Sequence, residues 1–259
     1  MYPTIIDSAD IADFSSFLRA LDVAHTHLRG LQPFWRGHTH IDWPLTPEVF
    51  RNSPWGKHYP EVTLIRTFMG QAESRTQRCP AYNDFVGWLI LARHFGLPTR
   101  LLDWSMSPLL ALFSAVEHQN DADAALWALD RGGLNQAMIG EDRQLIVDDP
   151  AVRELVSLAF EPDASVHLAA STRTAGRALA VGAREIDPRV MVQQGAFTIH
   201  GDQINLAAKK APWLVGFRVK REAKIILREN LRRLGITRSG LFPDLGSLAH
   251  DLKHKMWRT

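Results

Sequence analysis

Cysteine is almost absent from this sequence, which has only Cys79 among its 259 residues. One cysteine cannot form an intramolecular disulfide, and it excludes zinc sites built from several thiolates. This scarcity is typical of a reducing compartment. The first residues lack a basic segment followed by an apolar run, and no apolar stretch approaches the roughly 18 residues that span a bilayer. We therefore expect a cytoplasmic protein that has no membrane partner.

Several common catalytic motifs are also missing. The sequence has no glycine-rich loop ending in Lys-Ser or Lys-Thr, no three-glycine dinucleotide fingerprint and no glycine-flanked serine elbow. Histidine pairs stand at His25/His27 and His38/His40, but no carboxylate or cysteine at a regular spacing completes a ligand set. We therefore expect no metal. A nucleotide could still be held by arginines and helix N-termini.

The charge of the chain is nearly balanced, with a formal net charge of +2. This balance gives no support to a dedicated nucleic-acid-binding protein. Basic residues do cluster between Arg218 and Arg233, diluted by Glu222 and Glu229. The simpler interpretation is the solvated face of an amphipathic helix. The alternative is a nucleic-acid contact through residues 218–238.

Hydrophobic periodicity predicts a folded α+β protein. Helices are expected at residues 8–28, 61–77, 83–95, 107–118, 149–160 and 222–234 and from 242 onward. Strands are expected at 33–40, 124–129, 189–200 and 213–220. The sequence shows no repeat and no low-complexity linker, so we expect a single domain over 31–259, preceded by a helical lead-in over 1–30. Short twisted sheets packed with helices should form its frame.

Finer features are predicted within this outline. Asn83 should cap the third helix, and Ser107 with Pro108 should start the fourth. Gly132 and Gly133 should form a turn, and residues 161–188 show no clean period. In the last helix, three leucines at helical spacing should face inward: Leu245, Leu248 and Leu252.

The stretch from Arg93 to Ala115 places polar groups between two strongly apolar helices. It is expected to be a rigid loop, because leucines and Trp104 hold it against the core. Its polar side chains are His94, Thr99, Arg100, Asp103 and Ser105. His94 could act as a base, or it could simply favour a helix C-terminus. Arg100 could take an anion or could pair with Asp103 under the following helix.

Four separated stretches resemble the FRG domain family, named for a Phe-Arg-Gly signature. They are Phe34-Trp35-Arg36-Gly37, the long motif 93–115, Gln193-Gln194-Gly195-Ala196-Phe197 and Leu241-Phe242-Pro243-Asp244-Leu245. The long motif departs from the usual pattern by Arg93 in place of glutamine and Phe95 in place of tyrosine. The resemblance implies a bacterial or phage-associated protein from a defence or toxin setting.

The order of these motifs is similar to that of ADP-ribosyltransferases, which use an early Arg or His, an aromatic and hydroxyl-bearing middle segment, and a late Glu or Gln. The corresponding residues are Arg36, residues 99–105, and Gln193 or Gln194. An ADP-ribosyltransferase-like fold with NAD as substrate follows from this comparison. The expected catalytic residues are Arg36, Gln193 and Gln194. The expected NAD-binding residues are Arg36, Gly37, His94, Thr99, Arg100, Asp103, Trp104 and Phe197.

Chemically, NAD cleavage passes through an oxocarbenium-like transition state, as in glycoside hydrolysis. Arg36 could hold the diphosphate, and Trp104 or Phe197 could stack on nicotinamide. Adjacent strand residues face opposite ways, so only one of Gln193 and Gln194 can point into a site. Two other functions stay open. One is a non-catalytic module that senses a nucleotide or nucleic acid, and the other is a metal-dependent nuclease using His94 and Asp103.

Overall fold

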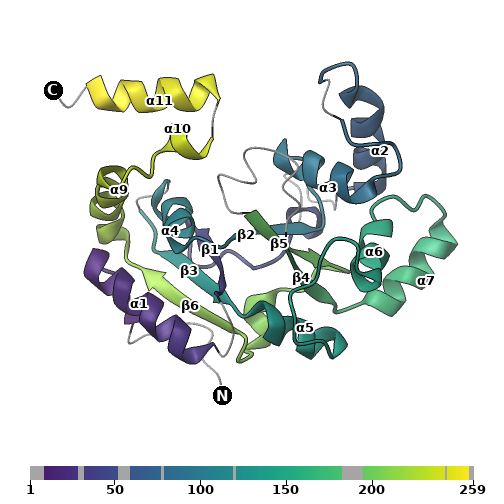
Figure 1. The fold of residues 1–259 in the computed structure, drawn as a ribbon, viewed down its shortest axis with the longest axis horizontal. Helices are drawn as coiled ribbons and strands as arrows, with labels where there is room; N and C mark the ends of the chain where they lie inside the picture. Colours follow the sequence, from purple (N-terminus) through teal and green to yellow (C-terminus); the bar gives the residue numbers. More distant parts are fainter. Residues whose placement is uncertain are drawn as a thin grey trace.

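The computed structural model describes residues 9–28, 32–51, 59–76, 79–118, 121–182, 195–242 and 244–256. These residues form an α+β fold in which helices surround one antiparallel sheet of six strands (Figure 1). The predicted fold class is therefore confirmed. The expectation of several short sheets is wrong, because all six described strands join a single sheet.

The sheet has the strand order β4-β5-β2-β1-β3-β6, and every neighbouring pair is antiparallel. The strands are β1 (Phe34–His38), β2 (Leu101–Ser105), β3 (Ala124–Leu129), β4 (Ala178–Gly182), β5 (Gly195–His200) and β6 (Leu214–Val219). The first two strands in the chain, β1 and β2, thus occupy the centre of the sheet. The Phe34–Gly37 stretch and the long motif 93–115 meet there.

Helices cover both faces of the sheet. They are α1 (Phe14–His27), α2 (Glu61–Ala72), α3 (Phe85–His94), α4 (Pro108–Val116), α5 (Arg131–Ile139), α6 (Pro150–Ser157), α7 (Ala164–Thr174), α9 (Lys224–Arg233), α10 (Arg238–Leu241) and α11 (Leu245–Met256). Short 3-10 helices lie at η2 (Glu48–Phe50), η3 (Leu206–Lys209) and η4 (Arg221–Ala223). Figure 1 shows α11 at one end of the molecule, apart from the sheet and next to α10.

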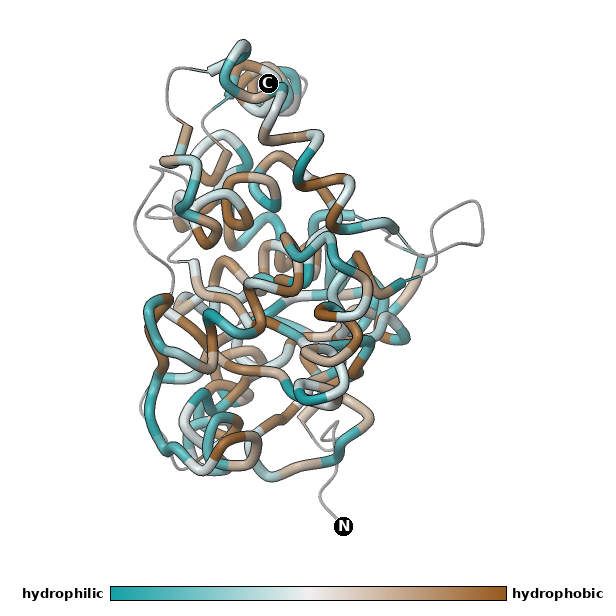
Figure 2. Tube along the Cα trace, turned by 90° about the vertical axis from the view of Figure 1, so that its right-hand side faces the viewer, coloured by the Kyte–Doolittle hydropathy of each residue, from teal (hydrophilic) through white to brown (hydrophobic). Residues whose placement is uncertain are grey.

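Three apolar clusters hold these layers together. On one face, α1, α4 and α9 pack on β1, β3 and β6, while α2, α3 and α6 pack with β2, β4 and β5. On the other face, Trp104, Trp127 and Leu134 belong to a third cluster that includes α5. Figure 2 shows hydrophobic and hydrophilic stretches alternating along the chain trace. Phe17 of the predicted lead-in is buried in the same cluster as Trp35.

Gly37 lets the backbone of α4 lie directly on β1. A Cβ atom at this position would stand 1.9 Å from the carbonyl oxygen of Ala111 and 2.6 Å from the amide nitrogen of Ala115. Both atoms belong to the α4 backbone and cannot rotate away. The glycine of the signature is thus required for helix packing, which is a different role from the predicted contact with NAD.

The largest correction concerns the long motif. The expected loop contains β2, which pairs along its whole length with β5, from Leu101 opposite Ile199 to Ser105 opposite Gly195. Leu102 and Trp104 are buried on one face and Leu101 on the other. A short strand buried on both faces shows no alternation of polar and apolar residues. For this reason the sequence pattern of residues 101–105 did not indicate a strand.

Smaller predictions also differ from the structure. Asp84 caps α3 in place of Asn83, by accepting a hydrogen bond from the amide of Gly87. Gly132 and Gly133 lie in the first turn of α5, whose N-cap is Asp130. Ser107 does occupy the N-cap position of α4, but its side chain makes no capping hydrogen bond.

The last helix differs most clearly in its orientation. Leu245, Leu248 and Leu252 were expected to face inward, yet they are 83%, 45% and 47% exposed. The helix begins at Leu245, as expected within a few residues. Helical spacing identified one apolar face correctly but could not indicate whether a partner element covers it.

We expect Gly37→Ala to lower the free energy of unfolding by about 2 kcal/mol or more, because the new methyl group overlaps the α4 backbone. Urea unfolding monitored by circular dichroism measures this change. Gly70→Ala is the matched control. Gly70 is exposed in α2, and a Cβ there meets no atom within 4 Å. It should stabilise the protein by about 0.5–1 kcal/mol. Equal effects of the two substitutions would contradict the packing role of Gly37.

Candidate functional site

The central sheet opens between β1 and β2. Their register contains one pair of residues, Trp35 opposite Ser105, whereas β1 and β3 pair over five positions. Beyond that point the backbone of β2 has no strand partner on its β1 side among the described residues. The side chain of Arg36 bridges the opening, because its Nη1 donates a hydrogen bond to the backbone carbonyl of Asp103. Arg36 therefore sits where the two halves of the sheet separate.

Charged side chains gather around this opening. Arg93 of α3 donates to Asp103 through Nε at 2.8 Å and through Nη2 at 2.7 Å, and its Nη1 lies 3.0 Å from Glu48 Oε2. Arg51, held by the carbonyl of Thr46 at 2.9 Å, adds a third guanidinium group. Three arginines thus face two carboxylates among the described residues, which leaves a formal positive charge at the opening.

The pKa values reflect this crowding of charge. Loss of hydration lowers the pKa of Arg36 to about 10, with Asp103 opposing the shift and Arg93 and Arg51 adding to it. Arg36 therefore remains protonated at neutral pH. Desolvation raises the pKa of Asp103, but the attraction of Arg93 and Arg36 outweighs it and holds the pKa below its usual value. The carboxylate is ionised and committed to Arg93.

A row of buried polar groups lies beside Arg36. His38 Nε2 accepts a hydrogen bond from Arg36 Nε at 2.8 Å. Thr198 Oγ1 accepts from Trp104 Nε1 at 3.1 Å and lies 2.9 Å from His200 Nε2. Burial and nearby arginines lower the pKa of His38 to about 2 and that of His200 to about 3, so both imidazoles are neutral.

A pocket of about 280 Å³ opens at this place, between β1, β2, α4 and α10. Four predicted binding residues line it: Arg36, Gly37, Asp103 and Trp104. Three aromatic residues are also among its lining residues, namely Trp35, Trp104 and Phe242. Trp35 and Trp104 are 1% and 3% exposed and face opposite sides of the sheet, so Phe242 supplies the accessible ring. The pocket thus combines a guanidinium group with an aromatic ring, which suits a ligand that has an anionic part and a ring.

Other predicted residues lie elsewhere. Phe197 stands opposite Asp103 on β5, and Trp104 stands opposite Ala196, so the two aromatic side chains face opposite sides of the sheet. They cannot stack on the same ring. Thr99 is fully buried, and His94 lies at the end of α3 with its ring against Phe95. None of Phe197, Thr99 and His94 lines the described pocket.

Arg100 is a structural residue in this geometry. Only 3% of it is exposed, and its Nη2 and Nε lie 2.6 and 3.0 Å from Glu61 Oε2. Glu61 Oε1 also accepts from the Arg100 amide at 2.7 Å. The predicted pair of Arg100 with Asp103 is therefore wrong: Glu61 holds Arg100, and Arg93 holds Asp103. Glu61 is the first residue of α2 and lies 39 positions before Arg100. No local sequence pattern could therefore indicate their contact.

Gln193 and Gln194 lie outside the described residues, so the structure gives them no place. Sequence reasoning missed the contributions of Glu48, Arg51 and His200. It noted His38 only as half of a histidine pair and Arg93 only as a departure from the family pattern. Alternation along β1 could have indicated His38, since it shares a strand face with Arg36.

The basic run is largely neutralised by neighbours. Arg218 and Lys220 lie near Asp10, Arg221 pairs with Glu222, and Arg232 pairs with Glu229. Lys224 is buried and donates to the carbonyl of Thr39 at 2.7 Å. These partners reduce the positive charge that the run offers to a nucleic acid.

In the part of the chain that the structure describes, no three His, Cys, Asp or Glu side chains are grouped so that they could hold a metal ion. No described helix has both the length and the apolar character needed to cross a membrane.

The geometry defines an arginine-centred pocket at the opening of an antiparallel α+β sheet. Residues 32–124 match the FRG domain family. This range contains β1, β2, α2, α3 and α4, and therefore both the opening and the charged cluster. The match confirms the predicted resemblance for this part of the chain. No curated protein and no solved structure matches the chain.

We expect Glu61→Gln to lower the free energy of unfolding by about 3–5 kcal/mol, because it leaves the buried Arg100 charge without its partner. The double variant Glu61→Leu/Arg100→Met should lose less, since it removes both charges. Urea unfolding of the single and double variants measures this. A double variant less stable than Glu61→Gln would contradict the pairing.

The free energy of unfolding should also decrease as the pH is lowered, because of His38 and His200. In the unfolded chain these rings take up a proton near their ordinary pKa of 6.5, whereas the folded rings resist it down to about 2 and 3. The unfolded state therefore binds more protons below pH 6.5, and the free energy of unfolding decreases as pH falls from there. Each ring contributes about 1.4 kcal/mol per pH unit.

His38→Gln keeps an acceptor for Arg36 and removes one titrating ring. We expect its loss of stability between pH 6 and pH 4 to be shallower than that of the wild type by about one proton, as measured by urea unfolding at several pH values. His25→Gln is the control, because His25 is exposed on α1. An identical slope for His38→Gln and the wild type would contradict a neutral buried His38.

Proposed function

We propose that the pocket at Arg36 binds NAD and that the protein is an ADP-ribosyltransferase-like or NAD-hydrolysing enzyme. The observation that carries this proposal is the excess positive charge around Arg36 at the opening between β1 and β2. A protein does not bury a guanidinium group among like charges without cost, and an anionic ligand would offset that cost. The diphosphate of NAD is such an anion, and guanidinium groups bind phosphate oxygens well.

The aromatic lining supports the same ligand. Phe242, which is only partly buried at the pocket, offers a flat surface for the nicotinamide ring or the adenine ring. The pocket volume of about 280 Å³ is at the lower end for small-molecule sites, so it would hold one part of NAD rather than the whole dinucleotide. The ADP-ribosyltransferase-like fold is part of the same proposal and rests on the order of the motifs along the chain.

The proposed reaction breaks the bond between the nicotinamide nitrogen and the ribose carbon. Nicotinamide leaves with the bonding electrons, and water or an acceptor side chain forms the new bond to the ribose. Arg36 would hold the diphosphate while positive charge develops on the sugar. Gln193 or Gln194 would bind the ribose hydroxyl. Action in the cytoplasm, as part of a phage-defence or toxin system, belongs to the same proposal and rests on the family resemblance.

Nicotinamide release from NAD tests the proposal. The wild type should release it, and Arg36→Ala should reduce the rate by about a hundredfold or more, because the diphosphate loses its charged partner. Arg36→Lys should retain part of the activity. Arg153→Gln is the charge-matched control, since Arg153 is an exposed residue of α6 paired with Asp148. Absence of release by the wild type, or equal release by Arg36→Ala, would overturn catalysis.

One observation favours a second candidate, a module that binds a nucleotide without turning it over. Among the described residues, the carboxylates next to the opening, Asp103 and Glu48, both bind Arg93. Neither is free to stabilise the developing positive charge. Calorimetry with NAD, ADP-ribose, DNA and RNA separates the two candidates. Binding of NAD or ADP-ribose without nicotinamide release supports the module.

A further inference from the structure

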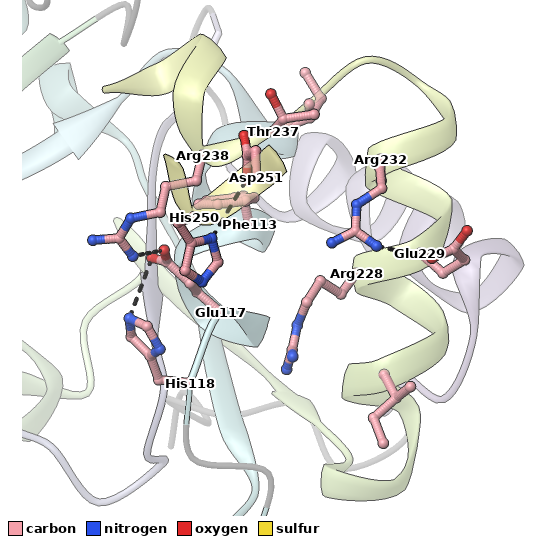
Figure 3. A pocket seen from close by; sticks show the side chains of 12 residues that line it. Phe113, Glu117, His118, Arg228, Glu229, Arg232, Thr237, Arg238, His250 and Asp251 are labelled. Carbon is pink, nitrogen blue, oxygen red and sulfur yellow. Dashed lines mark hydrogen bonds and ion pairs between the residues drawn. The ribbon is translucent and has the colours of Figure 1, made fainter. Parts of the chain in front are cut away.

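A second pocket, of about 260 Å³, lies between α4, α9, α10 and α11. Figure 3 shows Arg228 and Arg232 on one side of it, with Glu117 and His250 across the open space. This pocket shares no lining residue with the one at Arg36. The function proposed above does not use it.

The arginines of this pocket are held in place by its walls. Arg228 donates through Nε and Nη2 to the carbonyl of Val116, at 3.0 and 2.6 Å. Arg232 Nη1 lies 3.1 Å from Glu229 Oε2, and Arg238 pairs with Glu117. Because these contacts fix the guanidinium groups before any ligand arrives, little side-chain entropy remains to be lost on binding.

The two arginines of α9 are four residues apart and therefore lie on one side of the helix. Desolvation lowers the pKa of Arg228, and the like charge of Arg232 lowers it further, while Glu117 opposes the shift. An anion placed between the two guanidinium groups would relieve their repulsion. Phosphate oxygens match the fork geometry of arginine.

The carboxylates that line the pocket already have partners. Glu117 binds Arg238, and Glu229 binds Arg232. Asp251 accepts a hydrogen bond from the amide of Ser239 at 2.7 Å and lies 3.5 Å from His250 Nδ1. His118, the remaining titratable group, lies 3.7 Å from Glu117. Each carboxylate is thus engaged with a cation, a histidine or a backbone amide, so repulsion of an incoming anion is reduced.

Part of the lining is apolar. Phe113 of α4, Ile225 of α9 and Ile236 of the following loop all contribute to it. Ile225 is 61% exposed, so its side chain is accessible to a ligand at the pocket edge. The volume also exceeds what a single phosphate ion occupies. A ligand that joins a phosphate group to a small apolar group fits both features.

We propose that this pocket is a binding site for a phosphate monoester. The phosphoryl group lies between Arg228 and Arg232. The carbon portion of the ligand rests against Phe113, Ile225 and Ile236. Its binding does not depend on NAD chemistry at Arg36.

Calorimetry of the full chain with phenyl phosphate tests the proposal. Phenyl phosphate should bind at millimolar or lower concentration, inorganic phosphate more weakly, and phenol not at all. Arg232→Gln should weaken phenyl phosphate binding about tenfold or more, since it removes a charge-assisted contact. Ile225→Glu should do the same by placing a carboxylate at the pocket edge. Its exposed position makes a loss of folding unexpected, and circular dichroism checks this.

Two controls locate the site. Arg153→Gln removes an exposed arginine of α6 and should leave binding unchanged. Arg36→Ala should also leave it unchanged, which separates this pocket from the candidate NAD site. Loss of phenyl phosphate binding in Arg36→Ala, or equal binding by the wild type and Ile225→Glu, would overturn the assignment. Equal affinity for inorganic phosphate and phenyl phosphate would overturn the monoester.

Discussion

The contact between Arg36 and the Asp103 carbonyl is the interaction on which the candidate site depends. A central strand normally satisfies its backbone groups through neighbours on both sides. At this point β2 lacks that neighbour, and a side chain of β1 replaces it. The site therefore exists because a backbone ladder is interrupted. Asp103, whose carboxylate binds Arg93, also lines the pocket at this place.

Helix α4 explains how the interruption is tolerated. It begins two residues after β2 ends and returns across β1, with its backbone in contact with Gly37. Helix α4 thus follows β2 in the chain but packs on β1, which lies on the other side of the opening. Trp35 and Leu112 belong to the same buried cluster and secure this arrangement. The Arg-Gly pair of the signature has two separate tasks: Arg36 bridges the opening, and Gly37 admits the helix that covers it.

The helices and strands that were predicted correctly are those whose signals come from residues close together in the chain. Apolar periodicity located α2, α9 and β3 to within a few residues, and proline correctly marked the start of α4 and of α6. The sequence predicted less well what depends on distant partners. The Glu61–Arg100 pair joins residues 39 apart, and the apolar face of α11 shows no signal for its exposure. The sequence singled out Arg36 as a candidate residue but did not indicate its contact with the Asp103 carbonyl, and the contact of Arg93 with Asp103 was not predicted either.

The two pockets share two helices. On α4, Ala111 and Ser114 line the pocket at Arg36, and Phe113 lines the other. On α10, a helix of four residues, Leu241 lines the pocket at Arg36 and Arg238 lines the other. Arg238 already pairs with Glu117 before any ligand is bound, and the proposed phosphoryl position lies between two other arginines, Arg228 and Arg232. Coupling between two sites requires a conformational change that both ligands bias. Occupation of the second pocket without displacement of Arg238 therefore leaves the wall of the Arg36 pocket unchanged, and the two sites act independently.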